Sequence, residues 1–220
     1  MPLTLDERTL RRAAVVDDDP MVRAGYAEAL EDLGIEPWDV RELTGNLSDI
    51  WDSKFCDCDA VISDLKLMAP GYAPFNGGTL LAECWRKKLP AVLCTSYSDV
   101  SQLLPRSERR RVAAILPRTH FDLGKLREGL LRSIGELEGR FTPERRPWRT
   151  QVEIVDVPND SSYVWIIVMG RSPDEKVMVY TKELPAEVQG QVQPGMILHA
   201  KVNTGAKSAQ DLFFDEWEPK

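Results

Sequence analysis

The sequence predicts a two-domain protein: an α/β domain built on a doubly wound, five-stranded parallel sheet, followed by a small all-β barrel. Two observations lead to this prediction. In residues 1–138, short apolar runs alternate with segments of helical periodicity, which is typical of strand–helix–strand units. In residues 151–220, apolar residues instead recur at every second position between turn residues, which is typical of short antiparallel strands. Residues 139–150 mix Gly, Pro and Arg without apolar periodicity, so we expect a linker there.

Composition and charge restrict the class of protein. The 220 residues suffice for two modest domains, and the net charge of −7 argues against a general electrostatic affinity for nucleic acid. No run of about 18 apolar residues occurs, and the first residues lack the apolar core of a signal peptide. We therefore expect no membrane association and a cytoplasmic location. The cysteines show no framework-like spacing and are expected to be reduced.

Five apolar runs are the expected strands of the first domain: residues 13–16, 35–40, 59–64, 90–94 and 112–116. Segments of helical periodicity follow them: residues 20–33, 43–51, 79–88, 100–104 and 123–137. Pro20 suits the first turn of a helix, Asp19 suits its N-cap, and Gly34 suits its end. Pro37 within the second run favours an edge strand. Strands that alternate with helices in this way make a parallel sheet.

Polar residues follow four of the five expected strands. Asp17 and Asp18 follow the first, Asp64 ends the third, Thr95 follows the fourth and Arg118 lies just after the fifth. Because the carboxyl ends of parallel strands meet at one edge of the sheet, we expect these side chains to converge. Carboxylate oxygens suit Mg²⁺, which offsets their mutual repulsion. A carboxylate beside the metal can accept a phosphoryl group, while the hydroxyl and the cation each hold one phosphoryl oxygen.

In order and approximate spacing, the segments VVDDDP, AVISDLKL, LCTS and ILPR resemble the motifs of the receiver domain of two-component response regulators, over about residues 12–138. The resemblance implies a flavodoxin-like fold and a histidine kinase or phosphotransfer protein as the phosphoryl donor. It also implies that Asp64 is the phosphoacceptor and Thr95 the switch hydroxyl. The implied magnesium shell consists of Asp18, Asp64 and the backbone carbonyl of Lys66, with Asp17 acting through water.

Three features depart from the family pattern. Arg118-Thr119 stands where the family carries Lys-Pro, and an Arg need not reach phosphoryl oxygens as a Lys does. Ile115 stands at the position of the aromatic switch residue. The loop that follows Asp64 is about five residues longer than the family usually has, with Tyr72 and Phe75 expected beside the site, and we expect it to be a lid or a docking surface for a partner.

The second domain is expected to contain five short strands: residues 152–157, 163–169, 176–181, 197–202 and 212–217. Closure into a barrel of oligonucleotide-binding or SH3-like type would remove the edges that so small a sheet could not protect. Four aromatic side chains could stack on bases or fill the core, and the core is favoured: Trp165, Phe213, Phe214 and Trp217. A protein partner is therefore expected ahead of nucleic acid.

The leading functional hypothesis is a signalling regulator that takes a phosphoryl group on Asp64 and changes what its receiver surface or its β domain binds. One alternative is a receiver-like adaptor that is never phosphorylated. Another is a nucleic-acid-binding regulator that acts through the barrel. A magnesium-dependent phosphatase is less favoured, because such enzymes usually carry a second acid where this chain has Lys66. We therefore expect no enzyme activity, and a homodimer is left open.

Overall fold

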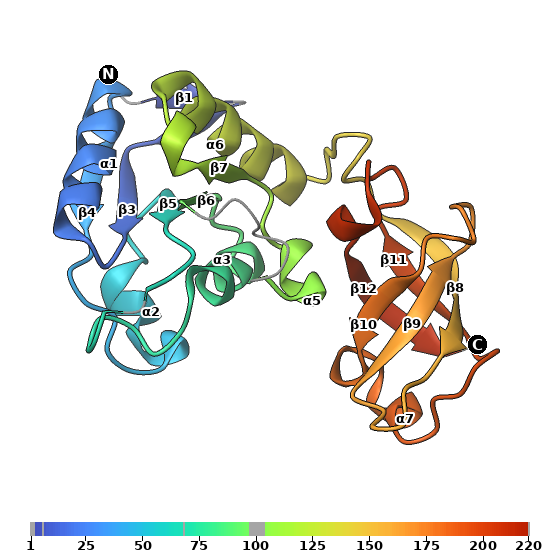
Figure 1. Ribbon diagram of the computed structural model, residues 1–220. Coiled ribbons are helices and arrows are strands. Elements are labelled where there is room, and N and C mark those ends of the chain that lie inside the picture. The colour runs from blue at the N-terminus through green and yellow to red at the C-terminus, as the bar shows by residue number, and fades with distance from the viewer. Residues whose placement is uncertain (1–2, 6, 68, 97–103, 220) are drawn as a thin grey trace. The chain divides into compact units, whose positions relative to one another are not determined.

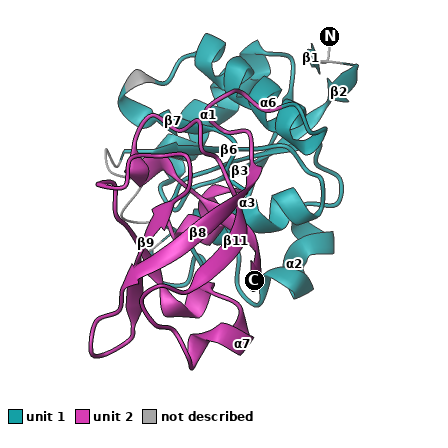
Figure 2. Cartoon of the chain, turned by 90° about the vertical axis from the view of Figure 1, so that its right-hand side faces the viewer, with its two compact units in different colours: residues 1–100, 111–140 teal, residues 101–110, 141–220 magenta. Residues whose placement is uncertain are grey.

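The computed structural model describes residues 3–5, 7–67, 69–96 and 104–219. The chain divides into two compact units, which Figure 2 draws in different colours. Residues 1–100 and 111–140 form the first unit, and residues 101–110 and 141–220 form the second. The helix predicted at residues 100–104 lies outside the described residues, apart from Leu104. No helix in the described part of the chain is long and apolar enough to span a membrane.

The first unit contains the predicted parallel sheet, in the order β4-β3-β5-β6-β7. Its strands are β3 (Arg12–Val16), β4 (Glu36–Asp39), β5 (Ala60–Ser63), β6 (Ala91–Thr95) and β7 (Ile115–Pro117). Counted along the chain, this order is 2-1-3-4-5, which is that of flavodoxin-like folds. Val16 lies opposite Ser63 in the register of β3 and β5, so these two strands end side by side. The predicted fold class of this half is confirmed.

Helices cover both faces of this sheet (Figure 1). They are α1 (Pro20–Asp32), α2 (Leu47–Lys54), α3 (Gly77–Arg86) and α6 (Leu123–Leu137). Figure 1 shows α1 and α6 on one face, and α2 and α3 on the other. Asp19 caps α1 as predicted, because its side chain accepts a hydrogen bond from the Met21 N–H. The β-branched and small residues of β3, β5 and β6 are buried between these layers.

Several element limits differ from the prediction. Helix α2 begins at Leu47 after Asn46, because Leu43 lies in a loop where its N–H donates to a backbone carbonyl. Strand β7 is only Ile115–Pro117, although the residues before it, Val112 to Ala114, are buried as expected of a strand. Burial against neighbouring elements, rather than strand pairing, explains the apolar character of that run.

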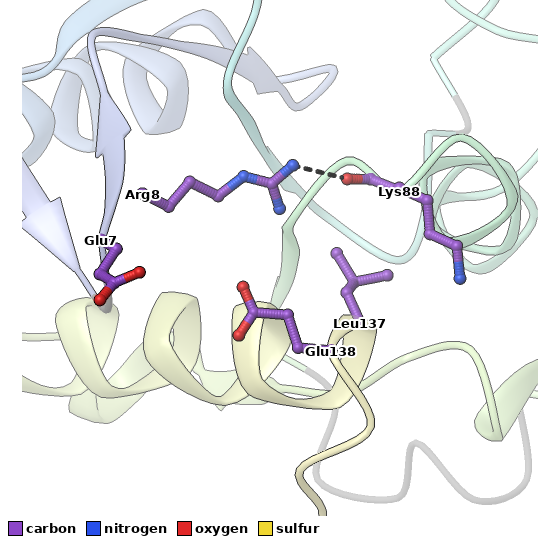
Figure 3. A pocket seen from close by; sticks show the side chains of 5 residues that line it. All are labelled: Glu7, Arg8, Lys88, Leu137 and Glu138. Atoms are coloured by element: carbon purple, nitrogen blue, oxygen red, sulfur yellow. Dashed lines mark hydrogen bonds between the residues drawn. The ribbon is translucent and has the colours of Figure 1, made fainter.

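An N-terminal hairpin, which was not predicted from the sequence, pairs β1 (Leu3–Leu5) with β2 (Arg8–Leu10). Its Leu5 and Leu10 are buried in the core that α1 and α6 share. The Arg8 guanidinium donates to the Lys88 carbonyl at 3.1 Å, beside a hollow of about 400 Å³ (Figure 3). Figure 3 also shows Glu138, from the end of α6, beside this hollow.

The second unit contains five antiparallel strands in the order β10-β9-β8-β11-β12. They are β8 (Trp148–Asp156), β9 (Tyr163–Val168), β10 (Val177–Tyr180), β11 (Ile197–Val202) and β12 (Phe214–Pro219). The predicted β domain is confirmed, but the sheet is a half-barrel: no pairing joins β10 to β12 in the described residues. The limits at residues 138 and 151 stay a prediction, while β8 begins at Trp148, inside the expected linker.

Short helical segments complete this unit: α5 (Arg106–Arg109), α7 (Ala186–Gln189) and the 3-10 turns η2 (Thr181–Glu183) and η3 (Ala209–Asp211). Helix α5 belongs here although it precedes β7 in the chain. The Arg106 guanidinium donates to the backbone carbonyls of Met178, Ala209 and Leu212 at 3.1, 3.0 and 2.7 Å. These bonds give the three carbonyls a donor, and they hold α5 on the β domain.

Aromatic residues of the second unit mainly fill its interior. Phe213 and Phe214 are buried, and Trp217 stacks on Phe214 with ring centroids 5.3 Å apart. Trp165 is half-buried and meets Tyr163 edge-on at 6.1 Å. The prediction that Phe213 and Phe214 serve the core is confirmed, and these two rings offer no stacking surface for bases.

Candidate functional site

Two buried acids lie side by side at the carboxyl ends of β3 and β5. Asp17 is 0% exposed and Asp64 is 5% exposed. The Asp64 N–H donates to the Val16 carbonyl at 2.9 Å, which fixes the two strand ends together. A Cβ at Gly77 would lie 1.8 Å from the Asp64 carbonyl oxygen, so only glycine lets α3 begin this close to the acid. The sequence therefore predicted the meeting of these two acids correctly.

Arg118, in the 3-10 turn η1 (Arg118–His120) that follows β7, bridges the two acids. Its Nη2 lies 2.7 Å from Oδ2 of Asp17 and 3.2 Å from Oδ1 of Asp64. Thr95, the last residue of β6, is buried, and its side chain hydrogen-bonds Asp64, which opposes the rise that burial causes in the pKa of Asp64. Four of the residues that the sequence singled out thus meet at one edge of the sheet.

Backbone amides contact each of the three acids. The N–H of Asp19 donates to Oδ1 of Asp17 at 2.9 Å. The N–H of Ala69 donates to Oδ2 of Asp18 at 2.7 Å, and that of Lys66 donates to Oδ2 of Asp64 at 3.2 Å. These bonds orient the carboxylates and partly compensate for their loss of water.

Burial dominates the acidity of the site. It raises the pKa of Asp17 to about 6, although the Asp19 N–H and the Arg118 charge act in the opposite direction. Burial also raises the pKa of Asp64, opposed by the N–H of Leu65 and by Arg118. Burial lowers the pKa of Arg118, but the nearby Tyr26 and the two acids outweigh that effect and raise it, so the guanidinium stays charged.

The donor chemistry suits a hard cation. The carboxylates of Asp17 and Asp64 face one guanidinium, and Oδ1 of Asp64 is buried with no hydrogen bond beyond its ion pair with Arg118. Among the described residues, however, no group of three or more His, Cys, Asp or Glu side chains is arranged to hold a metal ion. The predicted magnesium ligands, Asp17, Asp18, Asp64 and the Lys66 carbonyl, therefore stay a prediction.

The long loop after β5 places Tyr72 beside the site as expected, but buries its side chain against the backbone of Asp17 and Val40. Tyr72 is 6% exposed, and its hydroxyl accepts from the Asp17 N–H at 3.1 Å while donating to the Val40 carbonyl at 2.6 Å. The dipeptide Pro70-Gly71 just before Tyr72 is a turn sequence, and it was the feature from which a tight turn at this point could have been predicted. Ile115, at the position expected for an aromatic switch, is 38% exposed and faces away from the core.

Comparisons with known proteins place this geometry in context. Neither a family model nor a curated protein matches the chain. A response regulator receiver domain protein from Clostridium thermocellum is 20% identical, with a TM-score of 0.45, over 59% of this chain and 98% of its own. TrrA from Thermotoga maritima, solved in complex with Mg²⁺-BeF, is 24% identical, with a TM-score of 0.43, over 56% of this chain and 99% of its own.

The receiver domain of NtrX from Brucella abortus is 23% identical, with a TM-score of 0.44, over 56% of this chain and 97% of its own. The first unit is similar to receiver domains. The four sequence motifs predicted this class. The second unit has no counterpart in the three structures, which cover little more than half of the chain.

Proposed function

We propose that this chain is a two-component-type signalling regulator whose first unit accepts a phosphoryl group on Asp64 in a magnesium-dependent reaction. A histidine kinase or a phosphotransfer protein supplies the phosphoryl group. The phosphorylated state then changes how the protein binds a protein partner, through the surface of the first unit or through the β domain. The Asp17–Arg118–Asp64 bridge carries this proposal, because it brings the acceptor, a second acid and a cation together.

The chemistry is the transfer of a phosphoryl group from the donor atom to a carboxylate oxygen of Asp64. A carboxylate oxygen of Asp64 bonds to phosphorus while the bond from phosphorus to the donor oxygen or nitrogen breaks, and the donor keeps that electron pair. In this proposal Arg118 and Thr95, which both interact with Asp64, hold two of the phosphoryl oxygens. Magnesium, held by Asp17, Asp18, Asp64 and the Lys66 carbonyl, would offset the negative charge that gathers on these oxygens.

The test uses the full chain with Mg²⁺ and acetyl phosphate as the donor. Intact-mass measurement should show the addition of one phosphate in the wild type and none in Asp64→Asn. Asp52→Asn is the matched control, since Asp52 is an exposed carboxylate on α2 and should leave the uptake unchanged. Uptake that persists in Asp64→Asn, or its absence from the wild type, would contradict the proposal.

A phosphorylation-independent adaptor is the second candidate. The observation that favours it is that Arg118 pairs with both Asp17 and Asp64 and so offsets part of their charge. In a cell that depends on this protein, a folded Asp64→Asn variant should lose function if phosphorylation is needed. It should keep function if the chain is an adaptor. Circular dichroism of the purified variant separates loss of the phosphoryl group from loss of fold.

Nucleic acid is the weakest of the partner classes. Two of the four aromatic side chains that could have stacked on bases, Phe213 and Phe214, are buried. A gel-shift titration with single- and double-stranded oligonucleotides at moderate salt checks this point, and we expect no shift. A salt-dependent shift would contradict this expectation and would indicate binding through other surfaces of the β domain.

A further inference from the structure

A tight turn in the long loop after β5 contacts two consecutive acids, Asp17 and Asp18. We call residues 69–72 the acid-binding turn. Pro70 occupies its second position, Gly71 its third with φ of +82°, and the Tyr72 N–H donates to the Ala69 carbonyl at 3.0 Å. Proline followed by a left-handed glycine is the pattern of a type II turn, which fixes the first and last residues relative to each other.

Each end of this turn bonds one of two consecutive acids. At its start, the Ala69 N–H donates to the Asp18 carboxylate at 2.7 Å. At its end, the Tyr72 hydroxyl accepts from the Asp17 backbone N–H at 3.1 Å. A bond from an amide to a charged carboxylate is stronger than one between neutral groups. The turn therefore sets the position of Asp17 through its backbone and of Asp18 through its side chain.

The same tyrosine ties the acids to the loop that follows β4. Its hydroxyl donates to the Val40 carbonyl at 2.6 Å, and its backbone carbonyl accepts from the Leu43 N–H at 2.6 Å. Arg23 closes the arrangement, since its guanidinium lies 5.8 Å from the centre of the Tyr72 ring and donates to the Asp17 carbonyl at 2.6 Å. A displacement of the turn must therefore break or strain bonds at Val40 and Leu43.

We propose that the acid-binding turn positions Asp17 and Asp18 for the cation and transmits its binding, through Tyr72, to the loop after β4. This inference rests on the magnesium-dependent site of the proposed function. A cation that takes Asp18 as a ligand competes for the charge that the Ala69 N–H now contacts, so the turn must respond. Ile115 is aliphatic, whereas Tyr72 has an aromatic side chain whose hydroxyl is hydrogen-bonded to the backbone of Asp17. Tyr72 is a positioning residue, because it acts through Asp17.

The test is a titration of the uniformly ¹⁵N-labelled full chain with MgCl₂, followed by amide chemical shifts. In the wild type, the amides of Asp17, Ala69 and Leu43 should shift together and saturate. Tyr72→Phe keeps the ring but removes the hydroxyl, so Mg²⁺ affinity should fall by about tenfold and the Leu43 shift should shrink. Equal affinity and an equal Leu43 shift in this variant would overturn the inference.

A second variant, Gly71→Ala, tests the inference independently in case Tyr72→Phe does not fold. At Gly71 a Cβ would meet no atom within 4 Å, so Gly71→Ala disturbs only the left-handed backbone. It should weaken Mg²⁺ binding several-fold, whereas Gly25→Ala, equally uncrowded but helical, should not. Binding in the wild type without a shift of Ala69 or Leu43 defeats this inference alone. Absence of saturable binding in the wild type defeats the cation part of the proposed function as well.

Discussion

Replacing Asp17 by asparagine should remove a pH dependence of stability that arises from burial of this acid. Its pKa lies at about 6 in the folded protein instead of 3.8, so between these values the folded state binds more protons than the unfolded state. The stability that Asp17 contributes is therefore fully present below pH 3.8 and is lost as the pH rises through about 6. At 1.36 kcal/mol per pH unit, the loss is at most about 3 kcal/mol.

Urea unfolding of the wild type and Asp17→Asn at about pH 4 and about pH 7.5 measures this loss. The wild type should lose up to about 3 kcal/mol more unfolding free energy than the variant between these two values. Because groups far from Asp17 titrate alike in both proteins, their contribution to the unfolding free energy cancels in the difference. Asp52→Asn, which changes an exposed acid, should show no such difference. A difference between the wild type and Asp17→Asn that stays constant with pH would refute the reasoning.

Other substitutions test the contacts that build the site and the second unit. Arg118→Met leaves two buried acids without their cation and should cost about 3 kcal/mol at neutral pH, less in acid, by urea unfolding; Arg118→Lys should recover part of this. Gly77→Ala places a Cβ against the Asp64 carbonyl and should lower the melting temperature by several degrees, unlike Gly25→Ala. Arg106→Met removes the donor of three backbone carbonyls and should lower the free energy of unfolding by about 3 kcal/mol. The measurement is the melting temperature of the second unit, which should fall.

The convergence of Asp17, Asp64, Thr95 and Arg118 could be predicted from the sequence for a simple reason. The apolar runs fix where each parallel strand ends, and the alternation of strands and helices puts those ends on one edge. The start of α1 was equally accessible, since Asp19 and Pro20 act through local geometry. These features depend on neighbours in the chain.

The rest depends on contacts between distant residues, which no local pattern encodes. The bridge from Arg118 to both acids requires the three-dimensional positions of β3, β5 and β7 together. Tyr72 reaches Asp17 only because the long loop folds back, and Arg106 reaches Met178 across a large span of sequence. Strand pairing also decides whether the second sheet closes, and the alternating pattern of residues 151–220 is the same for an open and a closed sheet.

The place of α5 in the second unit has a consequence for synthesis of the chain. Helix α5 leaves the ribosome before any strand of the second unit, and the carbonyls that Arg106 contacts come from Met178, Ala209 and Leu212. The first unit can thus complete its parallel sheet while this segment is still waiting for its partners. Cutting the chain after residue 140 would remove the carbonyls of Met178, Ala209 and Leu212 that the Arg106 guanidinium contacts. A fragment of residues 141–220 would lack the helix altogether.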